Sequence, residues 1–219
     1  MTEPVLVSVN VGRARPSAHA ERGITGIDKR PVEGAVEVRD PGPKGTGGSG
    51  LAGDTICDLR HHGGSGQAVY AYAREDLDAW EAELGRTLPC GAFGENLTTR
   101  DLDLTGMLVG ERWRVGDRCV LQATSPRIPC RTFAGWLQDH GWIRRFAERG
   151  APGAYCSVVT PGPVRAGDPV LVVRRPDHDV TIGLMFRALT IEKALLPRLL
   201  AAGGDLPDDT RDYVLRRTA

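Results

Sequence analysis

Short apolar runs and apolar–polar alternation recur through the first three quarters of the chain, and both patterns are typical of β-strands with a buried face. The segments with these patterns are 5–11, 32–38, 68–73, 113–115, 119–123, 155–159 and 170–173. Gly116-Asp117 separates two of them, which predicts a hairpin and directs Cys119 toward a core. We therefore expect a strand-rich fold with an antiparallel sheet.

Apolar residues at helical spacing predict short helices between these strands and at the end of the chain. The helices expected between the strands are 74–84, 133–137 and 142–147. Gly85 is a natural stop for the first of them. Helical spacing returns after residue 176, and breaks at Thr190 and at 203–205 divide this tail into three short helices.

These elements together predict a mainly β fold with short helices. We expect residues 1–176 to form one domain whose sheet is a curved or closed β-barrel, because closure removes exposed strand edges. Residues 177–219 are expected to form a small three-helix extension. Roughly forty residues rarely sustain a core of their own, so this unit should pack on the barrel or on a partner.

Charge and composition exclude several classes of function. The 28 Lys and Arg residues balance 28 Asp and Glu residues, and a net charge of zero argues against a nucleic-acid partner. A hydrophobic fraction of 41% and a charged fraction of 26% are those of an ordinary folded domain. No signal-like segment and no apolar run of membrane-spanning length is present, so we expect a cytoplasmic protein without a membrane partner.

The five cysteines are widely spaced and form no CxxC pair, zinc signature or iron–sulfur signature. This spacing argues against a disulfide framework, a structural zinc site and an internal electron-transfer cluster. Cys57, Cys90 and Cys156 are expected to be small buried residues, although Cys156 could face a site from its strand.

Cys130 is the strongest candidate for chemistry. It stands in the segment SPRIPCRT, where a strand ends, two prolines stiffen a loop and a helix begins. A helix N-terminus and the flanking Arg127 and Arg131 favour a thiolate, which is a nucleophile or a ligand for a soft metal. The alternative is an inert cysteine in a turn.

Two further clusters carry polar groups beside glycines. His62 and Gly63 belong to the segment DLRHHGG, which either contributes to substrate or cofactor polarity or is a loop with one histidine bonded to backbone. Glu95 and Asn96 follow Gly94 in FGENLTT, where they either hydrogen-bond a heterocycle or form an Asx-type turn.

The order of these segments makes the chain similar to a known family. GLAGD, HHGG, AVYAY, FGENLTT and PRIPCRTFAGWL follow one another as in MOSC domains, and the bacterial YiiM-like subgroup is the most similar. The similarity covers most of residues 1–175, and the tail after residue 178 resembles the three-helix extension of this subgroup.

The resemblance implies a barrel-like fold that binds the molybdenum cofactor, with molybdenum on its molybdopterin dithiolene, and in which Cys130 supplies a thiolate to the metal. It implies reduction of N-hydroxylated compounds of the hydroxylaminopurine type, with electrons from a separate flavoprotein or iron–sulfur protein. Arg127, Arg131 and Thr132 would contact the cofactor, together with Asn96 and Gly63. Glu95 and His62 would contact substrate or deliver protons. Pyridoxal phosphate is not expected.

Other interpretations stay open at this point. The family carries Asp-Lys where this chain has Gly66-Gln67, so a cationic contact is absent there. The same Cys130 could serve a carrier module that holds persulfide sulfur or delivers cofactor without reductase activity, and a degenerate barrel would bind no cofactor at all. The helical tail could cover the barrel mouth, form a homodimer or dock an electron donor, and its pattern fits all three equally.

Overall fold

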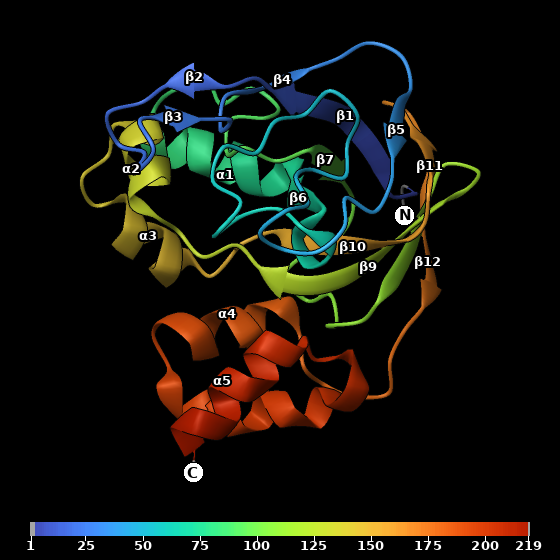
Figure 1. Cartoon of the computed structure of the whole chain (residues 1–219), viewed down its shortest axis with the longest axis vertical. Coiled ribbons are helices and arrows are strands. Elements are labelled where there is room, and N and C mark those ends of the chain that lie inside the picture. The colour runs from blue at the N-terminus through green and yellow to red at the C-terminus, as the bar shows by residue number, and fades with distance from the viewer. Residues whose placement is uncertain (1–2, 219) are drawn as a thin grey trace.

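The computed structural model describes residues 3–218. Its strands are β1 (Val5–Gly12), β2 (Arg15–Pro16), β3 (Ile24–Thr25), β4 (Lys29–Pro31), β5 (Val36–Val38), β6 (Val69–Ala73), β7 (Leu97–Arg100), β8 (Arg112–Val115), β9 (Cys119–Pro126), β10 (Ala154–Thr160), β11 (Gly162–Val164) and β12 (Val170–Arg174). Its helices are α1 (Arg74–Leu84), α2 (Arg131–Leu137), α3 (Trp142–Arg149), α4 (Ile182–Thr190) and α5 (Asp208–Thr218), with 3-10 segments η1 (Ser65–Gln67) and η2 (Lys193–Asp205). Figure 1 shows the sheet beside these helices.

Most of the predicted elements are confirmed, and α1 has the predicted bounds. The hairpin of β8 and β9 turns at Gly116, whose φ of +61° suits glycine, and Cys119 is fully buried. The predicted strand 32–38 is shorter than expected, since only Val36–Val38 are in β5. Among residues 3–218, no helix has the length and apolar character needed to cross a bilayer.

The sheet is mixed, which corrects the expectation that it is antiparallel throughout. Its order is β12-β8-β9-β10-β6-β7-β1-β4. The pair β6 and β7 is parallel, with Ala71 opposite Leu97 and Ala73 opposite Thr99. A parallel pair needs a crossover connection, and here α1 and the loop after it provide one.

The sheet is not a closed barrel, and this corrects the expectation of closure. The start of β1 reaches the segment before β12, where the Leu6 N–H donates to Asp168 O at 2.9 Å and Val5 bridges Pro169. Strands β1 and β12 do not continue as a paired ladder, because the end of β1, from Asn10 to Gly12, pairs with β4 instead. The sheet is therefore curved, and β4 and β12 remain separate edges.

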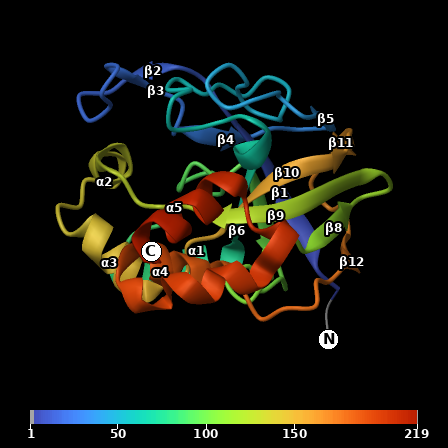
Figure 2. The same ribbon diagram turned by 60° about the horizontal axis from the view of Figure 1, so that its bottom comes forward.

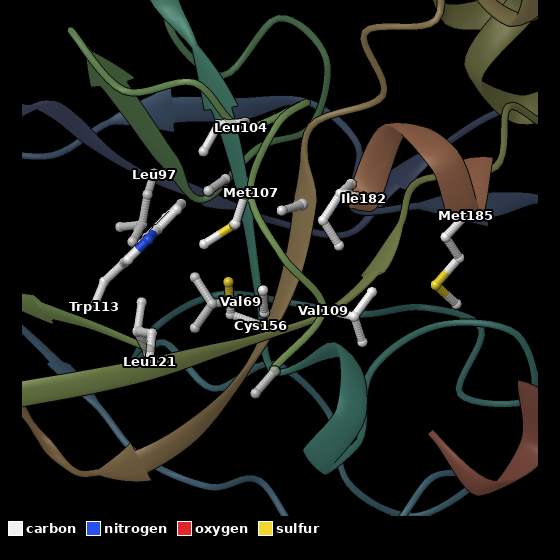
Figure 3. Packing of buried hydrophobic residues seen from close by; sticks show 14 of the residues in the cluster. Val69, Leu97, Leu104, Met107, Val109, Trp113, Leu121, Cys156, Ile182 and Met185 are labelled. Atoms are coloured by element: carbon white, nitrogen blue, oxygen red, sulfur yellow. The ribbon is translucent and has the colours of Figure 1, made fainter. Parts of the chain in front are cut away.

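One large buried cluster fills the inside of the curved sheet and extends to the C-terminal helices. Figure 3 shows Trp113, Leu121 and Cys156 from strands beside Met107, and Ile182 and Met185 of α4 in the same cluster. All six side chains are at most 2% exposed. The predicted division at residue 176 stays a prediction, while the buried cluster runs across it.

The C-terminal residues lie together on one side of the sheet in both Figure 1 and Figure 2. The sequence predicts three short α-helices there, whereas the middle segment, η2, is a 3-10 segment that contains Pro197 and a kink at Gly203. Proline lacks the N–H that an α-helix needs in its interior, which accounts for this difference.

A second buried cluster is aromatic and fixes the short helices. It brings together Tyr72, Trp80, Phe93, Phe133, Trp142 and Phe146. The Phe93 and Phe133 ring centroids are 5.1 Å apart, and those of Phe133 and Trp142 are 5.2 Å apart, both edge to face. Through Phe133 this cluster determines where α2 begins, and Cys130 is the residue that precedes α2.

Candidate functional site

A pocket of about 780 Å³, its open mouth included, lies where the loop before α2 meets β6 and the segments around residues 25, 56 and 95. Pockets of this size suit a small molecule or cofactor. Of the residues predicted for the site, it is lined by His62, Gly63, Asn96, Arg127, Cys130 and Thr132. Residues that were not predicted also line it, among them Lys29, Cys57, Gln67, Tyr70 and Tyr155.

Cys130 is half-buried at the mouth of this pocket. It is the N-cap residue of α2, with an extended backbone (φ −132°, ψ 172°), and its carbonyl accepts from the Ala134 N–H at 3.0 Å. The thiol also borders a second, outer hollow that includes Arg131 and Thr132. The structure therefore places the predicted nucleophile or metal ligand where both the pocket and solvent reach it.

Arg127 is a buried cation in the wall of the pocket, and only 7% of its surface is exposed. Its guanidinium carbon lies 4.2 Å from the centroid of the Phe133 ring and 5.1 Å from that of Tyr70. Its Nε is buried and has no hydrogen-bond partner among residues 3–218. A buried N–H of a cation without an acceptor is costly, and an anionic ligand in the pocket would satisfy it.

His62 and Gly63 form another wall. Burial, and secondly the charge of Arg127, lower the pKa of His62 to about 4. The imidazole is therefore neutral at pH 7. Gly63 has a φ of +78°, and a Cβ there would lie 2.7 Å from Gly48 O, so this position requires glycine. The adjacent His61 is exposed and does not line the pocket.

Lys29, Asp54 and Asn96 form a buried polar network at the pocket. Lys29 Nζ pairs with Asp54 Oδ1, and both side chains are at most 5% exposed. The Asn96 Nδ2 donates to Asp54 Oδ2 at 2.9 Å, and the Gly12 N–H donates to Asp54 Oδ1 at 2.7 Å. Burial lowers the pKa of Lys29 more than Asp54 raises it. Sequence reasoning missed Lys29, because a single charge beside a short strand carries no signal of its burial.

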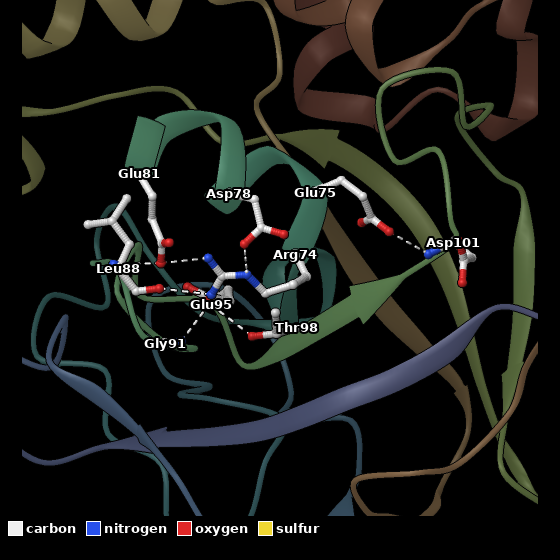
Figure 4. A network of polar contacts seen from close by, with 9 residues as sticks. All are labelled: Arg74, Glu75, Asp78, Glu81, Leu88, Gly91, Glu95, Thr98 and Asp101. Atoms are coloured by element: carbon white, nitrogen blue, oxygen red, sulfur yellow. Dashed lines mark hydrogen bonds and ion pairs between the residues drawn. The ribbon is translucent and has the colours of Figure 1, made fainter. Parts of the chain in front are cut away.

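Glu95 is fully buried and does not line the pocket. Its carboxylate accepts from the Gly91 N–H at 2.5 Å and the Thr98 hydroxyl at 2.9 Å (Figure 4). It also accepts from the Phe93 N–H at 3.0 Å. Burial raises its pKa, and these hydrogen bonds oppose the shift. The structure thus places Glu95 in the loop that carries Gly94 and Asn96 to the pocket.

Arg131 and Thr132 occupy different places. Arg131 is exposed at the start of α2 and borders only the outer hollow. Thr132 borders both hollows, and its hydroxyl donates to His19 O at 3.2 Å, which ties α2 to the segment after β2. Arg127 and Arg131, which the sequence groups together, therefore face different environments.

Cys57 corrects the expectation that it is a buried core residue. It is half-buried and lines the pocket, and burial raises its pKa while Lys29 and Arg22 oppose the shift. Cys156 of β10 is fully buried, as expected, and lies outside the pocket lining. Cys90 is half-buried, which corrects the expectation that it is buried, and it also lies outside the lining. The pocket therefore contains two accessible thiols, Cys130 and Cys57.

The arrangement combines two thiols, two buried basic side chains, a neutral imidazole and an unengaged cation N–H in one hollow. Thiolate sulfur is a ligand that soft metals prefer, and buried cations with free N–H groups favour anionic ligands. The walls formed by Tyr70 and Tyr155, whose ring centroids are 4.9 Å apart, are flat and apolar. These features together fit a planar anionic cofactor that carries a soft metal.

Known proteins resemble this chain along most of its length. The family model described as MOSC domain matches residues 58–171. The YflK protein of Bacillus subtilis (strain 168) is 30% identical over 81% of this chain and 76% of its own length. Protein YiiM of Escherichia coli (strain K12) is 28% identical over 95% of this chain and 92% of its own length.

Two further proteins are similar to this chain, one of them named for an activity and the other of known structure. A protein of Gibberella moniliformis (strain M3125 / FGSC 7600) named Reductase is 26% identical over 78% of this chain, which is 30% of that protein. The crystal structure of YiiM from Geobacillus stearothermophilus has a TM-score of 0.78 at 26% identity, covering 99% of this chain and 100% of that chain.

Proposed function

The chain belongs to the MOSC domain family, and from this premise we propose that it is a molybdenum-cofactor-dependent reductase of N-hydroxylated compounds. The observation that carries the proposal is the presence of the Cys130 thiol and the unengaged Nε of Arg127 in the lining of one pocket. The similarity to a protein named Reductase supports the class of reaction.

The residues of the pocket fit the cofactor. Cys130 is the half-buried thiol that would ligate molybdenum. Arg127 would balance negative charge of the cofactor, and the backbone at Gly63 would contact its pterin part. Lys29 and Asn96 also line the pocket, but Asp54 pairs with both of them, so they would support its wall. When bound, the cofactor would supply a metal that transfers two electrons to the substrate.

The reaction is R–NHOH + 2 H⁺ + 2 e⁻ → R–NH₂ + H₂O. The N–O bond breaks, the substrate nitrogen is reduced, and two protons complete the amine and the water. His62 is neutral at pH 7, so one ring nitrogen can hold a proton for transfer while the other can accept a replacement from solvent. Its place in both the inner and outer hollows suits this exchange.

The other residues hold these groups in place. The aromatic cluster positions Phe133 and so the start of α2, and Glu95 positions the loop that carries Asn96. Glu95 therefore acts on the site through this loop. The five cysteines lack iron–sulfur spacing, so a separate flavoprotein or iron–sulfur protein would supply the electrons.

Turnover with a chemical donor tests the proposal. The protein is produced in a host that makes molybdenum cofactor and is mixed with reduced viologen and 6-hydroxylaminopurine, and adenine formation is followed by chromatography. We expect adenine in proportion to the molybdenum-loaded protein. A loaded protein that forms no adenine would contradict the reductase and favour a carrier that binds the cofactor without reducing this substrate.

A further inference from the structure

Gln67 has a side chain that the protein itself leaves unengaged. Its Oε1 is buried without a hydrogen-bond partner, and neither end of its amide bonds to any group of residues 3–218. A buried amide end without a partner destabilises the fold unless a ligand engages it. The proposed mechanism uses His62 and Cys130 but gives Gln67 no role.

The backbone of Gln67 is fixed even though its amide is not. The Gln67 N–H donates to Gly64 O at 2.9 Å within η1. The Thr124 hydroxyl of β9 donates to Gly66 O at 2.6 Å, which ties η1 to the sheet. The side chain thus extends from a held backbone, as expected for a group that contacts a ligand.

Gln67 lies at the junction of three hollows. It lines the inner pocket with Cys130 and Tyr155, it lines the outer hollow that includes the same two residues, and it lines a third hollow toward the C-terminal helices. By contrast, Lys29, Asn96 and Arg127 line only the inner pocket. The buried cations therefore lie on the inner side, and Gln67 lies where a ligand enters from solvent.

The chemistry of this junction suits a neutral planar heterocycle. Tyr155 supplies an aromatic wall, and Gln67 supplies an amide with one donor end and one acceptor end. Because the protein holds neither end, a half-turn of the amide breaks no protein hydrogen bond. Gln67 can therefore offer either a donor or an acceptor to the edge of a nitrogen base.

We propose that Gln67 is the hydrogen-bonding residue that recognises the base part of an N-hydroxylated heterocyclic substrate at the mouth of the pocket. This inference rests on the proposed function and deepens it by naming the residue that recognises the base, whose ring edge carries both donors and acceptors. Gln67 contacts the substrate and sets its affinity, while Cys130 and Arg127 hold the cofactor.

Gln67→Leu tests the inference, because leucine has a similar size and no hydrogen-bonding group. On molybdenum-loaded protein we expect KM for 6-hydroxylaminopurine to rise about 5- to 10-fold, as for loss of one hydrogen bond, with kcat within about 2-fold. Molybdenum content should equal that of the wild type. An unchanged KM would overturn the inference, and so would a loss of molybdenum, since Gln67 would then serve the cofactor.

Gln122→Leu is the matched control. Gln122 is on β9, and its Oε1 accepts from Arg112 Nε at 2.8 Å. It shares the third hollow with Gln67 but lines neither the inner pocket nor the outer hollow, both of which contain Cys130. We expect this variant to keep the wild-type KM. A KM increase equal to that of Gln67→Leu would overturn the inference, because a general effect of removing a glutamine would explain both.

Binding measured without turnover separates this inference from the reductase proposal. Equilibrium dialysis of adenine against molybdenum-loaded protein gives a Kd whether or not the protein reduces anything. We expect Gln67→Leu to weaken this binding about 5- to 10-fold. If the wild type forms no adenine from hydroxylaminopurine, the reductase proposal fails, and the Kd comparison still decides the role of Gln67. Equal Kd values for the wild type and Gln67→Leu, or no adenine binding by the wild type, would overturn the role proposed for Gln67.

Discussion

The guanidinium of Arg127 lies on the ring of Phe133, 4.2 Å from its centroid. The residue three positions before Cys130 and the residue three positions after it are therefore in contact with each other. Phe133 belongs to the buried aromatic cluster, and Arg127 lines the pocket. The short segment between them carries the thiol. The position of Cys130 therefore depends on packing that is remote from solvent.

Arg127→Met separates the contribution that this arginine makes to packing from the contribution that its charge makes to cofactor binding. Methionine fills much of the same apolar space, while the charge and the unengaged Nε are removed. We expect the unfolding free energy of the cofactor-free protein not to fall, because a buried N–H without an acceptor disappears. Molybdenum content should fall at least about 10-fold if the charge contributes one ionic hydrogen bond to the cofactor.

Denaturant unfolding of the Arg127→Met protein checks the expected stability, and elemental analysis of the same preparation checks the expected molybdenum content. Arg127→Lys is the control, since it keeps the charge but not the planar guanidinium. Wild-type molybdenum content in Arg127→Met would contradict the assigned role.

Asp54→Ala should strongly destabilise the protein, because Lys29 would stay buried without its partner. Removing one partner of a buried ion pair costs about 3–5 kcal/mol. The double variant Lys29→Met/Asp54→Leu should lose less unfolding free energy than Asp54→Ala, because no unpaired charge remains buried. Only the N–H donors of Gly12 and Asn96 lose their acceptor. Urea unfolding of the three variants gives the comparison. A double variant less stable than Asp54→Ala would contradict this explanation.

The stability of the cofactor-free protein should depend on His62 in acid. Its pKa is about 4 in the folded protein, against 6.5 as the ordinary value, so the unfolded chain binds the proton more readily between these values. Stability therefore falls as the pH drops from 6.5 to 4, by about 3 kcal/mol in total for this group. His62→Gln should remove this part of the acid slope.

His61→Gln is the matched control for that measurement, since His61 is the exposed neighbour. Urea unfolding of the wild type and both variants between pH 4 and pH 7 gives the slope of the unfolding free energy against pH. Equal slopes for the wild type and His62→Gln would show that His62 is not held neutral by burial.

Glu95→Gln distinguishes a positioning role from direct catalysis. An amide cannot accept at both ends, so at least one of the donors at Gly91, Phe93 and Thr98 would lose its acceptor, at a cost of about 1–3 kcal/mol. We expect lower stability and lower molybdenum content, with kcat per bound molybdenum within a few-fold of the wild type. A fully loaded, equally stable variant whose kcat falls 100-fold would instead indicate that Glu95 takes part in the chemistry.

Local patterns in the sequence predict much of the fold and the strongest site residue. The apolar stripe of α1 with its Gly85 stop, and the Gly116 turn of the hairpin, are encoded by neighbouring residues. Cys130 stands out for the same reason, because prolines, arginines and a helix start surround it within a few positions. Predicting such features does not require knowledge of contacts between residues that are far apart in the chain.

Features that depend on distant contacts could not be predicted in this way. The parallel pairing of β6 with β7 and the failure of β1 and β12 to close the barrel depend on which strand edges meet. Lys29 and Cys57 reach the pocket only because the chain folds the segment 20–29 against the loop that follows Asp54. Glu95 is predicted as a site residue from its neighbours Gly94 and Asn96, yet three local hydrogen bonds direct its carboxylate elsewhere.

The most direct test of the account is the molybdenum content of the purified protein, measured by elemental analysis in the wild type, Cys130→Ser, Cys57→Ser and Cys90→Ser from one cofactor-competent host. We expect about one molybdenum per chain in the wild type and in Cys90→Ser, and loss of the metal in Cys130→Ser, because the serine hydroxyl is a poor ligand for a soft metal. Cys57→Ser should keep the metal. Metal-free wild type, or loss in Cys57→Ser with retention in Cys130→Ser, would contradict it.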